Sequence, residues 1–190
     1  SLKGPMQAVV PGVSRLYLLY HELRPGGSGY SYVLDTDAFG RHLDLYRKER
    51  GAGTAVLWPE VTFDDGHVSN VEYAAPALEA RGMTARFFIT VGWTGRKPGY
   101  MGWEQLRALH AAGHGIGAHG WSHTLLTHCD ADGLRRELGG ARAELEDRLG
   151  AAMTTMSLPG GRYNRRVIAA CEEAGYTEVY TSAPQAEAVQ

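Results

Sequence analysis

The sequence predicts an α/β fold, a distorted and incomplete (β/α) barrel of about six to seven strands. Short apolar runs alternate with amphipathic helical stretches along almost the whole chain, which is typical of a parallel sheet or barrel built from strand and helix units. Several helical stretches also end in a glycine just before the next apolar run, where a C-terminal helix cap is expected. These capping glycines are Gly82, Gly113, Gly150 and Gly175.

The expected strands are the apolar runs, and the expected helices are the stretches whose apolar residues recur every 3.6 residues. The strands are Leu16–His21, Val56–Phe63, Ala85–Thr90, Gly115–His119, Thr154–Leu158 and Glu178–Thr181. The helices are Thr36–Arg50, Ser69–Arg81, Trp103–Ala112, Ala131–Leu149 and Asn164–Ala174. In parallel α/β folds the functional side chains gather at the carboxyl ends of the strands, so chemistry is sought where each apolar run stops.

The length and composition indicate one ordinary globular domain. A chain of 190 residues fits a single domain, here 1–190 with residues 1–14 as an extended N-terminal segment. Hydrophobic residues make up 44% and charged residues 21%, close to average globular usage. A balance of 19 Lys+Arg against 21 Asp+Glu, without a basic cluster, argues against nucleic acid as a partner.

The sequence gives little information on location. No apolar run approaches the roughly 20 residues needed to cross a bilayer, so no transmembrane segment is expected. The start of the chain lacks the charged-then-apolar layout of a secretory signal, which slightly favours the cytoplasm. Because the chain begins at Ser1, a processed secreted form stays open. The oligomeric state is not predicted.

A pair of carboxylates follows the second expected strand. The run Thr62-Phe63-Asp64-Asp65-Gly66 places two adjacent aspartates before a glycine, which lets the backbone turn sharply. Asp-Gly pairs are also common in plain turns, so the run alone is weak. Its position after an apolar run, at the rim where active sites form, favours a function.

Two histidines, His119 and His123, lie at the end of the fourth expected strand. Their four-residue separation can bring both imidazoles to one metal if they share one face of a helical turn, although this spacing also occurs by chance. Together with an aspartate from another strand end they supply two nitrogens and one oxygen. That set suits zinc or a similar transition metal such as cobalt, nickel or iron, and it leaves positions for water and substrate.

With these two motifs in this order, the chain resembles the polysaccharide deacetylases of carbohydrate esterase family 4. The resemblance covers roughly Leu18 to Tyr180. Further matches are Phe87-Phe88, Trp103 to Leu109, and Ala112 to Gly117 leading into the first histidine. The resemblance implies a deacetylase-like barrel that removes N-acetyl groups from an N-acetylated sugar or polysaccharide.

The resemblance also implies the roles of individual residues. Asp65, His119 and His123 correspond to the ligands of one divalent metal ion, with zinc favoured, and Asp64 to the general base that takes a proton from the attacking water. This division is chemically reasonable, because a cation lowers the pKa of a water that it binds and a nearby free carboxylate can complete the deprotonation.

The family's third motif is a proline-containing loop, and it matches residues 157–164. Gly160 stands where the family supplies a backbone N–H that stabilises the oxyanion of the reaction. In the commoner form of this motif an arginine orients the catalytic aspartate, whereas this chain has Ser157 there. Arg162, further along the loop, is a candidate substitute.

The general acid of the family is normally a histidine in a Leu-x-His motif on the last strand, and no such motif follows Tyr163. Leu19-Tyr20-His21 instead ends the first expected strand. Some members, notably deacetylases of poly-N-acetylglucosamine, look circularly permuted so that this strand comes first. In a nearly closed barrel the first and last strands are neighbours, so His21 is expected to act as the acid.

Substrate contacts are expected from four side chains: Trp121, His67, Tyr163 and Arg162. Each also has an ordinary structural interpretation, since aromatic residues near a barrel rim often serve packing. Two other functions stay open. One is a non-catalytic glycan-binding relic of the same fold, and the other is a metal amidohydrolase that acts on a small non-sugar amide.

Overall fold

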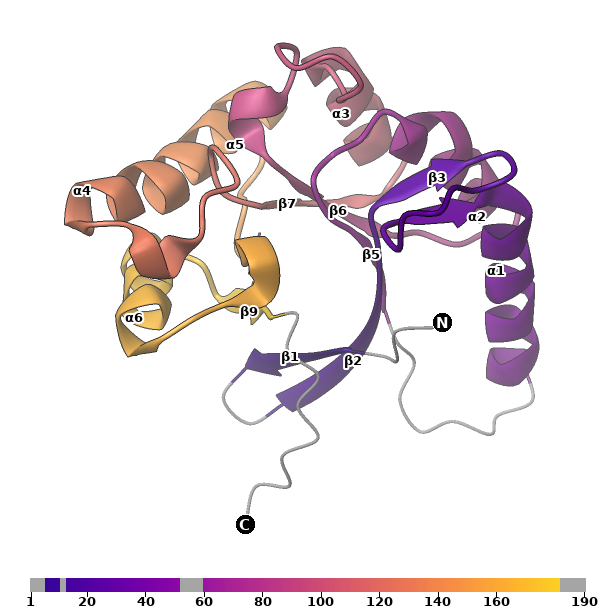
Figure 1. Cartoon of the computed structure of the whole chain (residues 1–190), viewed down its shortest axis with the longest axis horizontal. Coiled ribbons are helices and arrows are strands. Elements are labelled where there is room, and N and C mark those ends of the chain that lie inside the picture. The colour runs from indigo at the N-terminus through magenta and orange to yellow at the C-terminus, as the bar shows by residue number, and fades with distance from the viewer. Residues whose placement is uncertain (1–5, 11–12, 52–59, 182–190) are drawn as a thin grey trace.

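A computed structural model describes residues 6–10, 13–51 and 60–181 (Figure 1). Parallel strands form a curved sheet in the order β2-β5-β6-β7-β8-β9. Their bounds are Val13–Tyr20, Glu60–Phe63, Arg86–Ile89, Gly115–Ala118, Thr155–Ser157 and Glu178–Tyr180. Strand β1, Met6–Val10, runs antiparallel between β2 and β9 and closes the barrel through the pair Ala8 and Tyr180. The predicted (β/α) barrel is confirmed.

In Figure 1 the helices form an arc around the sheet, and the side with β1 lies outside this arc. The α-helices are α1 Thr36–Gly51, α2 Ala75–Glu79, α3 Trp103–Ala111, α4 Ala131–Leu134, α5 Ala141–Leu149 and α6 Arg165–Glu173. The π-helical turn η1 Asn70–Ala74 leads into α2, and the π-helical turn η4 Arg135–Gly140 joins α4 to α5. The short 3-10 turns are η2 Val91–Trp93, η3 Leu126–His128 and η5 Pro159–Gly161. Each predicted helix is confirmed. All four predicted capping glycines have positive φ, between 64° and 92°. No helix in the described ranges is long and apolar enough to cross a membrane.

Most predicted strands agree with the structure, and the differences concern short elements. In the predicted strand Val56–Phe63 the last part is β5, while residues 56–59 lie outside the described residues. The apolar patterns did not predict β1, nor the parallel pair β3 Glu22–Arg24 and β4 Val33–Asp35. Strands of three residues are too short to show an alternating pattern.

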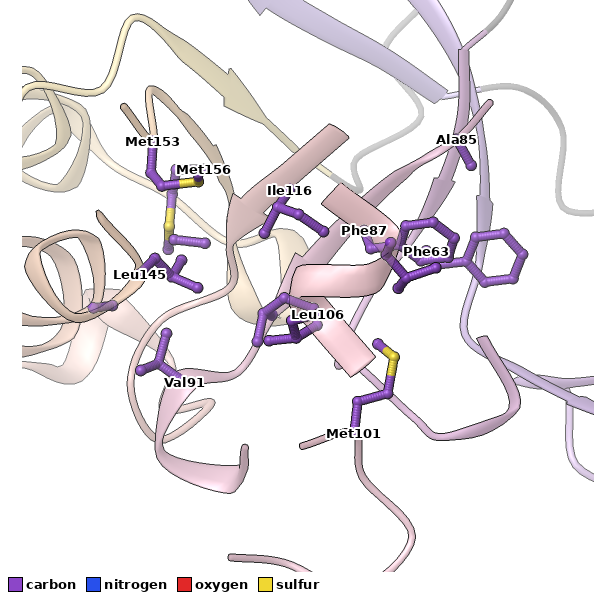
Figure 2. Close-up of a cluster of buried hydrophobic side chains, with 14 of the residues drawn as sticks. Phe63, Ala85, Phe87, Val91, Met101, Leu106, Ile116, Leu145, Met153 and Met156 are labelled. Carbon is purple, nitrogen blue, oxygen red and sulfur yellow. The ribbon is translucent and has the colours of Figure 1, made fainter. Parts of the chain in front are cut away.

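The hydrophobic core lies between the outer face of the barrel and the helices. Figure 2 shows Phe63, Phe87 and Ile116 from β5, β6 and β7 beside Leu106 of α3. The rings of Phe63 and Phe87 stack with centroids 5.2 Å apart. Burying one such side chain stabilises the fold by about 1.5–3 kcal/mol, so this layer fixes the outward direction of alternate residues on each strand.

The inside of the barrel is filled by aromatic rings. Phe88, next to the outward-facing Phe87, packs on Tyr180 with ring centroids 4.8 Å apart, and Tyr17 packs on Tyr180 at 5.0 Å. Gly117 belongs to this crowded interior, because a Cβ there would lie 2.7 Å from the Phe88 ring. The barrel is therefore packed below its mouth, and polar chemistry is confined to the strand ends above.

Candidate metal centre and catalytic site

The alternation of side chains along the strands brings three polar residues to the mouth of the barrel. Phe63, Ala118 and Met156 belong to the outer core, so the next residues, Asp64, His119 and Ser157, face inward. These three are 4%, 1% and 6% exposed. They come from the ends of β5, β7 and β8, as expected for a site of a parallel α/β fold.

Asp65 joins this group through an unusual backbone conformation. In a regular strand its side chain would point away from that of Asp64, but its φ is 78°, in the left-handed region. Gly66 follows with a φ of 88°. Aspartate tolerates this region better than most residues, and such backbone strain is found at functional sites. The predicted sharp turn is confirmed, and it starts one residue earlier than the glycine.

The predicted metal ligands converge on one point. Nε2 of His119 and Nε2 of His123 each lie 3.2 Å from Oδ1 of Asp65. Asp65, His119 and His123 form a group whose candidate ligand atoms all lie within 4.8 Å of one another. His119 donates from Nδ1 to the backbone carbonyl of Ser157 at 2.8 Å, which leaves Nε2 as the ligand atom in the neutral ring.

Electrostatics inside the group favour a positive charge. Burial raises the pKa of the Asp65 carboxyl, but the imidazoles of His119 and His123 outweigh it and hold this pKa well below its usual range. Burial lowers the pKa of His119, yet Asp64, Asp65 and the Ser157 carbonyl together raise it to about 9. Oδ1 of Asp65 is buried with no hydrogen-bond partner in the described part of the chain. The two imidazole nitrogens and this carboxylate oxygen together form a donor set that fits zinc or a similar cation.

His123 lies on a loop that is held by a buried carboxylate. Glu137 of η4 is fully buried and accepts hydrogen bonds from the backbone N–H groups of Trp121 and Ser122, both at 2.9 Å, and from the Ser122 hydroxyl at 2.6 Å. His123 itself has a φ of 63°. Charge-assisted hydrogen bonds of this kind are strong, so Glu137 fixes the loop that presents the second imidazole.

His21 directly follows β2 and lies beside Asp64. The Asp64 N–H donates to the Tyr20 carbonyl at 2.9 Å, and Tyr20 packs against the outer core, so His21 faces inward by alternation. Burial lowers the pKa of His21, and the charges of the nearby carboxylates oppose this effect. Asn70, fully buried, donates from its side chain to the His21 carbonyl at 2.8 Å. The role of His21 as general acid stays a prediction.

Gly160 lies in the loop between β8 and α6. Its φ is 65°, and a Cβ at this position would lie 2.7 Å from Cδ2 of Leu125, so the position favours glycine. A Cβ at Gly120, next to His119, would meet Pro159 at 3.5 Å, which places this loop against the histidine loop. The oxyanion role of its N–H stays a prediction.

The structure places the four expected substrate-contacting residues differently. Trp121 is half-buried and packs against the core, with Arg96 5.9 Å from the ring centroid. His67 contacts Ser69 at 2.8 Å, and its Nε2 lies 3.7 Å from Glu22. The exposed Tyr163 lines a hollow together with Val179, and Arg162 is exposed. The role of these four residues as substrate contacts stays a prediction.

Three features of this site were not predicted from the sequence: the role of Glu137, the contact of Trp93 with His123 and the side-chain role of Ser157. A signal existed for Glu137, because it falls within the stripe of apolar residues that contains Leu134 and Leu138, where a charge is unexpected. Trp93 stacks on His123, with ring centroids 5.3 Å apart and planes 22° apart. No sequence pattern could have shown this contact, since it depends on how the loop folds.

Comparison with known proteins identifies the family of the chain. The sequence profile described as polysaccharide deacetylase matches residues 59–179. A putative polysaccharide deacetylase of Bacillus subtilis, YxkH, is 29% identical over 192 residues, which cover 89% of this chain and 64% of that protein. Chitin deacetylase 1 of Cryptococcus neoformans is 28% identical over 119 residues, covering 63% of this chain and 24% of that protein. The chain thus spans under two thirds of the length of either relative.

A solved structure has the same fold. The deacetylase PplD of Streptococcus pyogenes, determined in complex with acetate, superimposes with a TM-score of 0.74 at 18% identity, covering 92% of this chain and 83% of that one. The chain therefore has a (β/α) barrel of the same type as this deacetylase. With the matched profile, which extends over more than half of the sequence, the chain belongs to the polysaccharide deacetylase family.

Proposed function

We propose that the protein is a metal-dependent hydrolase that removes N-acetyl groups from an N-acetylated sugar or polysaccharide. The observation that carries this proposal is the convergence of Asp65, His119 and His123 on one point beside the buried Asp64. Membership of the polysaccharide deacetylase family supports the substrate class. The reaction adds water across the amide bond and releases acetate and a free amine.

Asp65, His119 and His123 would hold the cation, and zinc is the metal that their donor set favours. When bound, a divalent cation supplies Lewis-acid activation of water and polarises the amide carbonyl. Asp64 is the proton acceptor. Its Oδ2 lies 3.9 Å from Nε2 of His119, and its buried Oδ1 makes no hydrogen bond to any residue that the structure describes. That oxygen is available to take the proton of the attacking water.

His21 donates a proton to the departing amine. It faces the mouth of the barrel from the strand next to the one that ends in Asp64, so base and acid approach the substrate from neighbouring strands. Burial lowers the pKa of its imidazole, which makes the protonated ring a stronger acid. The N–H of Gly160 stabilises the negative charge that develops on the carbonyl oxygen. Trp121, His67, Tyr163 and Arg162 remain candidates for contacts with the sugar.

Acetate release from N-acetylglucosamine oligomers, with and without a chelator and with zinc restored, tests the proposal. We expect release that the chelator stops and zinc restores. Zinc binding without acetate release from any acetylated glycan would favour a glycan-binding relic, and release only from small non-sugar amides would favour the amidohydrolase. The position of Asp64 argues against the relic, because a binding module gains nothing from a buried carboxylate beside a metal site.

The variant Asp64→Asn separates catalysis from metal binding. Because asparagine keeps the shape of aspartate but cannot take the proton, we expect kcat to fall by about 10²–10⁴-fold. Zinc affinity, measured by calorimetry, should stay within about threefold of the wild type, since Asp64 is not a ligand. Loss of zinc binding in this variant would mean that Asp64, and not Asp65, holds the metal.

A further inference from the structure

We infer that Ser157 is the positioning residue of this enzyme for the catalytic base, in the place where the commoner form of the motif has an arginine. The inference rests on the proposed function, in which Asp64 accepts a proton. The Ser157 hydroxyl donates to Oδ2 of Asp64 at 3.1 Å. This contact joins residues from β8 and β5, which do not pair with each other in the sheet.

Burial makes this hydrogen bond important for the orientation of the carboxylate. Asp64 is 4% exposed and Ser157 is 6% exposed, so solvent competes little for either group. The other carboxylate oxygen, Oδ1, is buried without a hydrogen-bond partner among the described residues. The hydroxyl therefore holds one oxygen of Asp64 and leaves the second free for the water. Without it, the carboxylate could rotate about its last bond.

Ser157 contacts the metal site with its backbone as well. Its carbonyl accepts the Nδ1–H of His119 at 2.8 Å, which sets the ring of a metal ligand. One residue thus fixes the base through its side chain and a ligand through its main chain. This position is rigid, because the residue pairs in register with Tyr180 and the next N–H, that of Leu158, donates to the Tyr180 carbonyl at 3.0 Å.

This assignment replaces the expectation that Arg162 takes over the role of the missing arginine. Arg162 is exposed on the loop after η5, whereas the donor that reaches Asp64 comes from the end of β8. A serine hydroxyl is a neutral donor, so it orients Asp64 without adding a positive charge beside the metal site. The same task is therefore performed here by a shorter side chain at the same position in the chain.

The variants Ser157→Ala and Ser157→Thr test the inference. Alanine removes the hydroxyl and keeps the carbonyl that holds His119, so we expect kcat to fall about tenfold while KM and the zinc dissociation constant stay within about twofold. Threonine keeps the donor and should return kcat to within about threefold of the wild type. Thr155→Val, which removes a buried hydroxyl of the same strand that contacts Arg86, is the matched control and should leave kcat unchanged.

A second readout does not depend on turnover. Crystal structures of zinc-loaded wild type and Ser157→Ala should show the Asp64 carboxylate in two different rotations. An unchanged carboxylate, or a kcat of Ser157→Ala within twofold of an active wild type, overturns the inference. If the wild type releases no acetate, the proposed function fails, and the two crystal structures still decide whether Ser157 positions Asp64.

Discussion

The two halves of the candidate metal site are held in different ways. His119, like Asp64, is fixed by the strands, and its side chain is 2% exposed. His123 lies on a loop, its side chain is 35% exposed, and the backbone just before it, at Trp121 and Ser122, is held by hydrogen bonds to Glu137. Strand register thus fixes one imidazole and a single buried carboxylate fixes the other. One half of the site is therefore rigid, whereas a single substitution can loosen the loop that carries the other half.

Replacement of the proposed general acid, His21 at the end of β2, should have the largest effect of the variants that test this difference between the two halves. His21→Ala removes the proton donor from the strand-held half, and we expect kcat to fall by about 10²–10³-fold. Zinc affinity should not change, because His21 is not a ligand. Steady-state kinetics and calorimetry measure the two quantities, and near-normal turnover would remove His21 from the mechanism.

Loss of Glu137 should act on the loop-held half. Glu137→Ala leaves the N–H groups of Trp121 and Ser122 without their acceptor, so we expect zinc to bind about 10–100-fold more weakly. Ser122→Ala, which removes only one of the donors to Glu137, should weaken binding less. As a control, Glu144→Ala removes a carboxylate of α5 that pairs with Arg148 at the surface, and zinc affinity should stay unchanged. Equal zinc affinities in all three variants would contradict the proposed division of the site.

For a change of one pH unit, the smallest expected effect comes from the uptake and release of a proton by His119. Its pKa of about 9 means that the metal-free ring is protonated below that pH, and zinc must displace this proton to bind. Zinc binding at pH 8 should therefore release roughly one proton, seen as a dependence of the calorimetric enthalpy on the buffer. Zinc affinity should fall about tenfold for each unit of pH below 9 on account of this group. In Glu137→Ala the release should persist, because His119 belongs to the strand-held half.

The sequence was sufficient for the barrel and for locating the candidate metal ligands, because both follow from short-range patterns. Apolar periodicity and capping glycines located the helices, and the polar residues at strand ends located Asp64, Asp65 and His119. The left-handed backbone of Asp65 could not be predicted, since aspartate adopts the extended conformation more readily. The contacts of Ser157 and Glu137 join residues 93 and 15 positions apart, and only the folded chain brings these partners together.

Two contacts of the ring of strands are narrow among the described residues. β1 meets β9 at the pair Ala8 and Tyr180, and β7 meets β8 at the pair Ala118 and Met156, whereas β6 and β7 share four pairs. The strands that lead to Asp64 and His119 are joined through β6 and do not depend on either narrow contact. β2, which leads to His21, shares four pairs with β5. Transient separation at a narrow contact would therefore leave the proposed base, the proposed acid and His119 on one continuous piece of sheet.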